Sequence, residues 1–190
     1  MNFEHVRRDN CYYVDKTRFI EKIEDANKYF FFIRPRRFGK SLTLSMLAHY
    51  YDVNMKDRFE ELFGDLYIGS HPTPERNQYL ILNLNFAAIH ADLDNYKEEM
   101  DKYSYRVFRA FCDRYQAILP ANFAERVLRE QTAVDLLDCV CTECQTAGLK
   151  LYLFIDEYDH FTNKILAHPD ALNKYREETH GEGYIRKFYD

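Results

Sequence analysis

The sequence predicts an α/β fold built on a parallel sheet. Three apolar stretches are predicted strands, at 28–33, 79–85 and 150–155. Long stretches with helical spacing of apolar residues lie between the second and third of them. Strands that alternate with helices form parallel sheets whose crossover helices cover the faces. We therefore expect three layers, α/β/α, with the sheet in the middle.

Bulk composition is that of one globular domain. The chain has 190 residues, of which 46% are hydrophobic and 30% are charged, values typical of folded domains. We expect one domain over 1–190, with an N-terminal extension at 1–27 and a core at 28–190. The formal net charge of -5 argues against general electrostatic binding to nucleic acid or to a membrane. With no signal peptide and no apolar run near 18 residues, we expect a soluble protein. The five cysteines have no disulfide-framework spacing, which suits a reducing cytoplasm.

A phosphate-binding motif follows the first predicted strand. Residues 34–41 are Arg-Pro-Arg-Arg-Phe-Gly-Lys-Ser, and a predicted helix continues from them. Strand, tight loop, Gly-Lys-Ser and helix is the layout of a P-loop, or Walker A motif, whose backbone N–H groups attract an anion. Lys40 would reach the β- and γ-phosphates, and the Ser41 hydroxyl would hold Mg²⁺. The expected nucleotide-binding residues are Arg36, Arg37, Phe38, Gly39, Lys40, Ser41 and Leu42.

The arginines of this loop leave alternatives open. Arg34 stands where the pattern G-x-x-x-x-G-K-[ST] has glycine. A positive φ at Arg34 would cost about 1 kcal/mol, so the loop either begins with an ordinary φ or carries strain. Arg36 and Arg37 contact phosphates or a partner, or they are solvated surface residues. The alternative for the whole stretch is a basic turn between a strand and a helix.

Two acidic residues end the third predicted strand. The stretch 151–157 is apolar up to Asp156 and Glu157, which is the Walker B pattern. Parallel strands present ligand-binding groups at their carboxyl ends, so we expect Asp156 at the same edge as Lys40 and Ser41. Asp156 would hold Mg²⁺ together with Ser41, and Glu157 would polarise an attacking water. The alternative is an ordinary exit from a strand into a loop.

Asp15 and three cysteines are weaker candidates for ligands. Asp15 precedes a predicted helix at 18–25, where Asp is favoured as an N-cap, and we prefer that role to ligand binding. Cys139, Cys141 and Cys144 suggest a metal site. No His lies within ligand spacing, and on a helix the first two would point to nearly opposite sides. We therefore expect buried, unreactive helix cysteines.

Between the second and third predicted strands, two helices have the clearest sequence signals. The segment 91–119 has aromatic and apolar residues near helical spacing, which favours core packing over a partner surface. The segment 132–147 begins with Thr132 and Asp135 at the spacing of a capping box, and Gly148 follows it.

Three stretches together resemble the AAA-ATPase-like family. They are Tyr-Val-Asp-Lys-Thr at 13–17, Phe-Ile-Arg-Pro-Arg-Arg-Phe-Gly-Lys-Ser-Leu at 32–42 and Phe-Ile-Asp-Glu-Tyr-Asp at 154–159. The resemblance covers nearly the whole chain. It implies a P-loop NTPase fold of the additional-strand class, with ATP and Mg²⁺ as ligands. Members often carry a PD-(D/E)XK nuclease-like region after the ATPase domain, which is the implied partner in a longer protein.

The resemblance also implies a strand that the sequence does not supply. In this class a further strand follows Walker B, lies between the P-loop strand and the Walker B strand, and brings a polar residue that senses the γ-phosphate. No apolar strand follows Ile155. We hypothesise that the chain is the N-terminal part of a longer protein, incomplete at its C-terminus. The sheet would then have a gap beside the first strand, or the two strands would pair abnormally.

Our main hypothesis is Mg²⁺-dependent ATP binding and hydrolysis to ADP and phosphate. Lys40 and Glu157 would be catalytic, and Ser41 and Asp156 would hold the metal. The first alternative is a nucleotide-binding switch without turnover, which Arg34 and the missing strand favour. The second is a nucleic-acid-associated module whose basic loop contacts the DNA backbone, which predicts binding that weakens steeply with salt.

Overall fold

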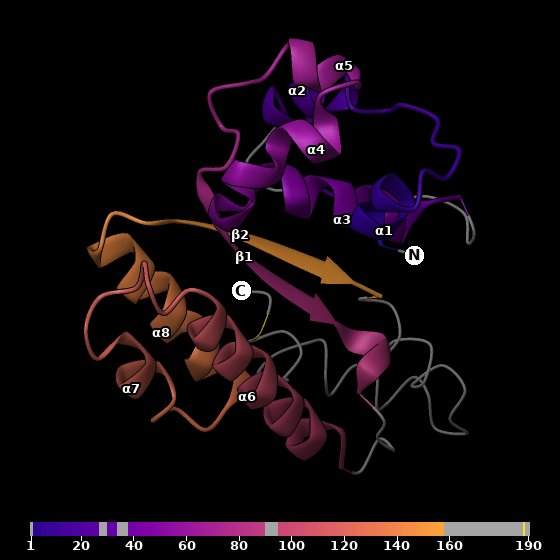
Figure 1. Ribbon diagram of the computed structural model, residues 1–190. Coiled ribbons are helices and arrows are strands. Elements are labelled where there is room, and N and C mark those ends of the chain that lie inside the picture. Colours follow the sequence, from indigo (N-terminus) through magenta and orange to yellow (C-terminus); the bar gives the residue numbers. More distant parts are fainter. Residues whose placement is uncertain (1, 27–29, 34–37, 90–94, 158–187, 189–190) are drawn as a thin grey trace, which may run out of the picture. The chain divides into compact units, whose positions relative to one another are not determined.

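The computed structural model describes residues 2–26, 30–33, 38–89, 95–157 and 188 (Figure 1). The chain divides into two compact units, Met1–Ile81 and Leu82–Asp190, and each is described by itself. The elements of the first unit are α1 (Phe3–Arg8), α2 (Phe19–Glu24), α3 (Lys40–Tyr51), η1 (Val53–Arg58), α4 (Phe59–Phe63) and α5 (Tyr67–Ser70), and the division falls within β1 (Tyr79–Asn85). The second unit continues with η2 (Phe86–Ala88), α6 (Tyr96–Arg114), α7 (Phe123–Val127), α8 (Ala133–Thr146) and β2 (Lys150–Asp156).

The core of the first unit is aromatic. Phe3, on α1, is fully buried. Its ring meets Tyr13 edge-on with 5.3 Å between centroids and stacks on Phe63 at 5.0 Å. Tyr50, on α3, meets Phe63 edge-on at 5.6 Å. Such pairs stabilise a core beyond the area that they bury, so α1 is an integral part of this unit.

Asp15 caps a helix other than the one predicted. The N-cap residue of α2 is Arg18, without a side-chain hydrogen bond. Asp15 instead accepts hydrogen bonds at Oδ1 from the Thr17 backbone N–H at 2.8 Å and hydroxyl at 2.7 Å. Its Oδ2 accepts from the Tyr67 N–H, at the start of α5, at 2.8 Å. The preference of Asp for backbone N–H groups was a sound guide, but the helix that it caps lies 52 residues further on.

These hydrogen bonds keep the Asp15 carboxylate ionised. Burial acts to raise the pKa of Asp15, but the hydrogen bonds from Tyr67 and Thr17 outweigh it and lower the pKa below the ordinary value. Thr17 itself is fully buried, and its Oγ1 accepts from the Ile68 N–H at 3.1 Å. The segment before α2 is therefore tied to α5 through two adjacent backbone N–H groups.

The predicted first strand is wrong for the residues that the structure describes. Residues 30–33 are not in a strand, and the side chains of Phe31 and Ile33 are 76% and 81% exposed; residues 28 and 29 lie outside the described part. The described strands are β1 and β2, which pair with each other. An apolar run becomes a buried strand only where a neighbouring strand pairs with its backbone, and the sequence pattern does not reveal whether one does.

The sheet of β1 and β2 is parallel (Figure 1). Both strands occur where the apolar stretches predict them. In β1 the side chains of Leu80, Leu82 and Leu84 are buried. Parallel strands need a long crossover connection, and here the connection contains α6, α7 and α8. The structure is thus a mixed α/β arrangement with a small parallel sheet.

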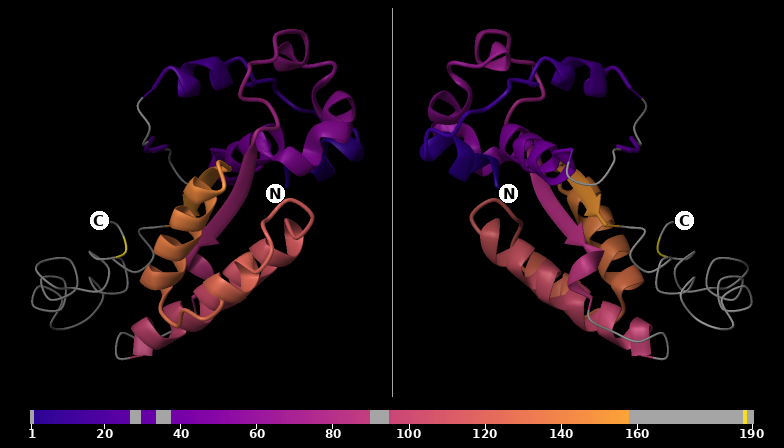
Figure 2. Two further views of the ribbon diagram at one scale, coloured as in Figure 1. Left: turned by 90° about the vertical axis from the view of Figure 1, so that its left-hand side faces the viewer. Right: turned by 90° about the vertical axis from the view of Figure 1, so that its right-hand side faces the viewer.

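Helices α6 and α8 pack side by side in the second unit (Figure 2). The predicted core stripe of α6 is confirmed at Tyr96, Met100, Tyr103 and Phe111, all of which are buried. The Tyr103 hydroxyl accepts a hydrogen bond from the Asn85 N–H at 2.7 Å, at the end of β1. This contact fixes α6 to the carboxyl end of the strand.

The start of α8 shows the N-cap half of the predicted capping box. Thr132 is the N-cap residue, and its Oγ1 accepts from the Asp135 N–H at 3.1 Å. The same hydroxyl donates to Asp135 Oδ2 at 2.6 Å. Asp101, on α6, accepts from the Ala133 N–H at 2.7 Å. Two of the N–H groups at this helix start are therefore satisfied by side chains. After the helix, Gly148 has a φ of 66°, as expected for a glycine that ends a helix.

In the part of the chain that the structure describes, none of the helices is both long enough and apolar enough to span a membrane.

Candidate functional site

The predicted phosphate-binding loop leads into α3. Gly39 is the N-cap residue of this 12-residue helix, with φ 80° and ψ 19°. Glycine adopts this left-handed conformation without the steric cost that a Cβ atom brings. The Gly39 carbonyl accepts from the Thr43 N–H at 2.9 Å and from the Thr43 hydroxyl at 3.0 Å. These two hydrogen bonds from Thr43, in the first turn of α3, hold Gly39 in place at the helix start.

The N-cap residue of α3 is a glycine, so it has no side chain that could cap the helix. The first N–H groups of a helix lack partners within the helix and carry a partial positive charge. Lys40 and Ser41 are the first two residues of α3, and Ser41 is exposed. A Cβ atom placed at Gly39 would meet no described atom within 4 Å. Helix starts commonly bind anions, and anion binding at this one stays a prediction.

Only two of the remaining predicted loop residues lie in the part of the chain that the structure describes. Phe38 is 64% exposed and Leu42 is half-buried. Arg34, Arg36 and Arg37 lie outside the described residues. The expectations for these three arginines, including the φ of Arg34, stay predictions.

The predicted acidic pair lies at the carboxyl end of β2. Asp156 is the last residue of the strand, and Glu157 follows with a φ of 54°. The Glu157 N–H donates to Asp156 Oδ1 at 2.9 Å. A left-handed conformation costs a residue with a Cβ atom about 1–2 kcal/mol, and such strain is concentrated at functional sites. Sequence reasoning missed this feature because Glu has no preference for that conformation.

The two halves of the predicted site belong to different units. Gly39, Lys40 and Ser41 lie in the first unit, and Asp156 and Glu157 lie in the second. Their convergence on one edge of a sheet stays a prediction. The strand expected after Walker B also stays a prediction, because residues 158–187 lie outside the described part.

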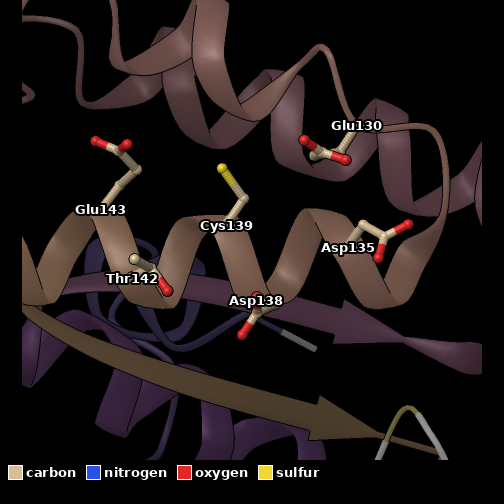
Figure 3. A pocket seen from close by; sticks show the side chains of 6 residues that line it. All are labelled: Glu130, Asp135, Asp138, Cys139, Thr142 and Glu143. Carbon is tan, nitrogen blue, oxygen red and sulfur yellow. The ribbon is translucent and has the colours of Figure 1, made fainter.

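A separate pocket of about 290 Å³ lies beside α8 (Figure 3). Its lining residues are Glu130, Asp135, Asp138, Cys139, Thr142 and Glu143. Arg126 binds Glu143 through two hydrogen bonds, of 2.7 Å and 2.5 Å, and they lower the pKa of Glu143. Four of its six lining residues are acidic, and among the described residues no group of three or more His, Cys, Asp or Glu could hold a metal ion.

The cysteines of α8 only partly follow the prediction. Cys144 is buried, and burial raises the pKa of its thiol to about 12. Burial also raises the pKa of Cys139, which is half-buried. Raised thiol pKa values make both groups poor nucleophiles at neutral pH. Cys141 is exposed, so the expectation that it is buried is wrong. Cys141 comes two residues after Cys139, so it points to another side of the helix, toward solvent.

Comparison with models of known protein families identifies the family of this chain. A model of the family described as predicted AAA-ATPases matches residues 1–190. The chain belongs to the AAA-ATPase-like family. This agrees with the resemblance carried by the loop, the acidic pair and the Tyr-Val-Asp-Lys-Thr stretch.

One curated relative of this AAA-ATPase-like chain comes from Azotobacter chroococcum mcd 1, where it is described as an uncharacterized protein in the vnfD 5' region. It is 43% identical over 60 residues, which are 32% of this chain and 11% of that protein. The match thus spans a small part of the relative's length. No solved structure matches the chain.

Proposed function

We propose that this chain is a Mg²⁺-dependent ATP-binding domain that hydrolyses ATP to ADP and phosphate. The observation that carries the proposal is the start of α3, where Gly39 takes a left-handed conformation and Lys40 and Ser41 follow it. The family, described as predicted AAA-ATPases, supports the nucleotide as the anion. The domain would cover 1–190, with a P-loop NTPase fold, an extension at 1–27, a core at 28–190, Walker A at 34–41 and Walker B at 151–157.

Each proposed role rests on the chemistry of a side chain. The backbone N–H groups after Gly39 bind phosphate oxygens, and the absence of a Cβ atom lets the phosphate approach closely. Lys40 neutralises phosphate charge. The Ser41 hydroxyl and the Asp156 carboxylate supply the oxygen ligands that Mg²⁺ prefers. Glu157 orients a water and accepts its proton. When bound, Mg²⁺ would stabilise the negative charge that develops on the phosphates.

Nucleotide binding is tested by calorimetric titration of the chain with Mg-ATP. We expect Lys40→Ala to weaken binding by about tenfold or more, because a charge-assisted contact to phosphate is lost. Lys56→Ala is the matched control, since Lys56 is an exposed lysine of the same unit, on η1, and its removal leaves binding unchanged. Equal affinities for the two variants would contradict the proposed site.

Hydrolysis is tested by phosphate release from ATP in the unaltered chain and in Glu157→Gln. We expect release to fall by about a hundredfold or more in the variant, since the group that accepts the proton is removed, while Mg-ATP binding persists. Equal release at the background rate in both would instead favour the switch without turnover. The two experiments therefore test the binding proposal and the hydrolysis proposal separately.

A further inference from the structure

The inference concerns what holds the backbone of Gly39 at the start of α3. The N-cap residues of α1 and α8, Asn2 and Thr132, have extended backbones, and their side chains accept hydrogen bonds from the first helix turn. Gly39 is left-handed and has no side chain. Glycine has the freest backbone of all residues, and helix ends fray easily. The conformation of Gly39 must therefore be stabilised by groups on neighbouring residues.

Thr43 supplies two such groups. Its backbone N–H donates to the Gly39 carbonyl at 2.9 Å, which is the ordinary hydrogen bond of a helix. Its hydroxyl donates to the same carbonyl at 3.0 Å. A carbonyl oxygen has two lone pairs, so it accepts both hydrogen bonds at once. The helix itself does not require the second hydrogen bond, which holds the Gly39 carbonyl pointing along α3 toward Thr43.

The direction of this carbonyl fixes the direction of an N–H group. In a planar trans peptide unit the C=O and the following N–H point in opposite directions. Because the Gly39 carbonyl points into the helix, the Lys40 N–H points out of the helix start. This N–H is one of those that bind phosphate oxygens in the proposed function. Rotation of the peptide unit between Gly39 and Lys40 would turn the N–H away from the phosphate.

We propose that Thr43 is a positioning residue of the nucleotide site, whose hydroxyl aims the Lys40 N–H at the phosphate by holding the Gly39 carbonyl. The inference rests on the proposed function and adds to it a residue outside the expected nucleotide-binding residues at 36–42. The hydroxyl acts through Gly39, and it raises the fraction of molecules in which the N–H already points outward. The apparent affinity for the nucleotide falls in proportion to that fraction.

The alternative interpretation of the Thr43 hydroxyl is purely structural, because Thr hydroxyls in helices often bind the carbonyl four residues earlier. Thr146 does so at the end of α8, where its hydroxyl donates to the Thr142 carbonyl at 2.8 Å. At that end of a helix, carbonyl groups lack partners and N–H groups do not. Thr146 is therefore a matched control, with the same hydroxyl contact and no N–H group to aim.

The first test needs no ligand. Amide hydrogen exchange at residue 43, whose N–H donates to the Gly39 carbonyl, reports opening of the helix start. After correction for intrinsic exchange, we expect Thr43→Val to lower the protection of this amide about threefold relative to that of Val140, which is buried in α8. Thr and Val are both β-branched and have similar helix propensities. Thr43→Ser, which keeps the hydroxyl, should keep the protection.

The second test is calorimetric titration with Mg-ATP. We expect Thr43→Val to weaken binding about threefold, Thr43→Ser to restore the affinity, and Thr146→Val to leave it unchanged. The inference would be overturned by full protection in Thr43→Val, by lost protection with unaltered affinity, or by an equal loss of affinity in Thr146→Val. Failure of the proposed function is a different result, in which the unaltered chain binds no Mg-ATP, and the inference fails with it. Should Thr43→Val not fold, Thr43→Ala removes the same hydroxyl.

Discussion

The left-handed backbone at Glu157 predicts an unusual order of stabilities among variants. Glu157→Gly and Glu157→Ala both remove the carboxylate, but only glycine tolerates a φ of 54° without steric cost. The left-handed conformation costs alanine about 1–2 kcal/mol. Glycine loses about 0.5–1 kcal/mol of this advantage through the greater freedom of its unfolded chain. We expect Glu157→Gly to be the more stable by about 0.5–1 kcal/mol.

Urea denaturation measures this difference. For a slope of about 2 kcal/mol per molar urea, the midpoint of Glu157→Gly lies about 0.25–0.5 M above that of Glu157→Ala. Thr142, inside α8, gives the matched control, because in a helix Gly is less stable than Ala by about 1 kcal/mol. The order of the two variants should therefore be reversed there. Should glycine prove less stable than alanine at both positions, Glu157 is not left-handed in solution.

Three further predictions concern buried polar contacts. Thr17→Val leaves the Ile68 N–H without its acceptor and should lower the free energy of unfolding by about 1–3 kcal/mol; Thr17→Ser, which keeps the hydroxyl, should cost far less in the same thermal melt. Because the pKa of Asp15 is lowered from 3.8, its stabilising contribution is present above that value and is lost as the pH falls through the folded-state pKa. In urea titrations at a series of pH values, Asp15→Asn should weaken the loss of unfolding free energy at acid pH. An unchanged pH dependence would mean that the hydrogen bond from Tyr67 does not stabilise the ionised carboxylate. Ser104 is fully buried, with no hydrogen-bond partner for its Oγ among the described residues, so Ser104→Ala should raise the unfolding free energy by about 1 kcal/mol, whereas a loss would indicate a bound water.

Local signals predicted much of the second unit. The strands at 79–85 and 150–155 and the helix N-cap at Thr132 depend on residues close in sequence, and the structure has them. The strand predicted at 28–33 is absent over the described residues 30–33, because pairing depends on a neighbour distant in sequence. The same limit applies to Asp15, whose capping preference was readable but whose partner, Tyr67, was not.

In the candidate site, too, the features with a local sequence signal were predictable and the others were not. The motif at Gly39, Lys40 and Ser41 predicted a helix start, and α3 begins there; phosphate binding at this start stays a prediction. The apolar run before Asp156 predicted an acid at a strand end, and β2 ends there. The strain at Glu157 has no signature in composition or spacing, since it depends on how the chain leaves the sheet. The meeting of the two motifs stays a prediction.

The burial of Phe3 bears on how this domain should be produced. Domain limits drawn at the first predicted strand would start the polypeptide at residue 28. Such trimming removes Phe3, Val6 and Ile20, all of them buried, and uncovers the aromatic rings on which α1 rests. Newly uncovered apolar surface of this kind promotes aggregation. Expression vectors for this domain should therefore retain the first residues.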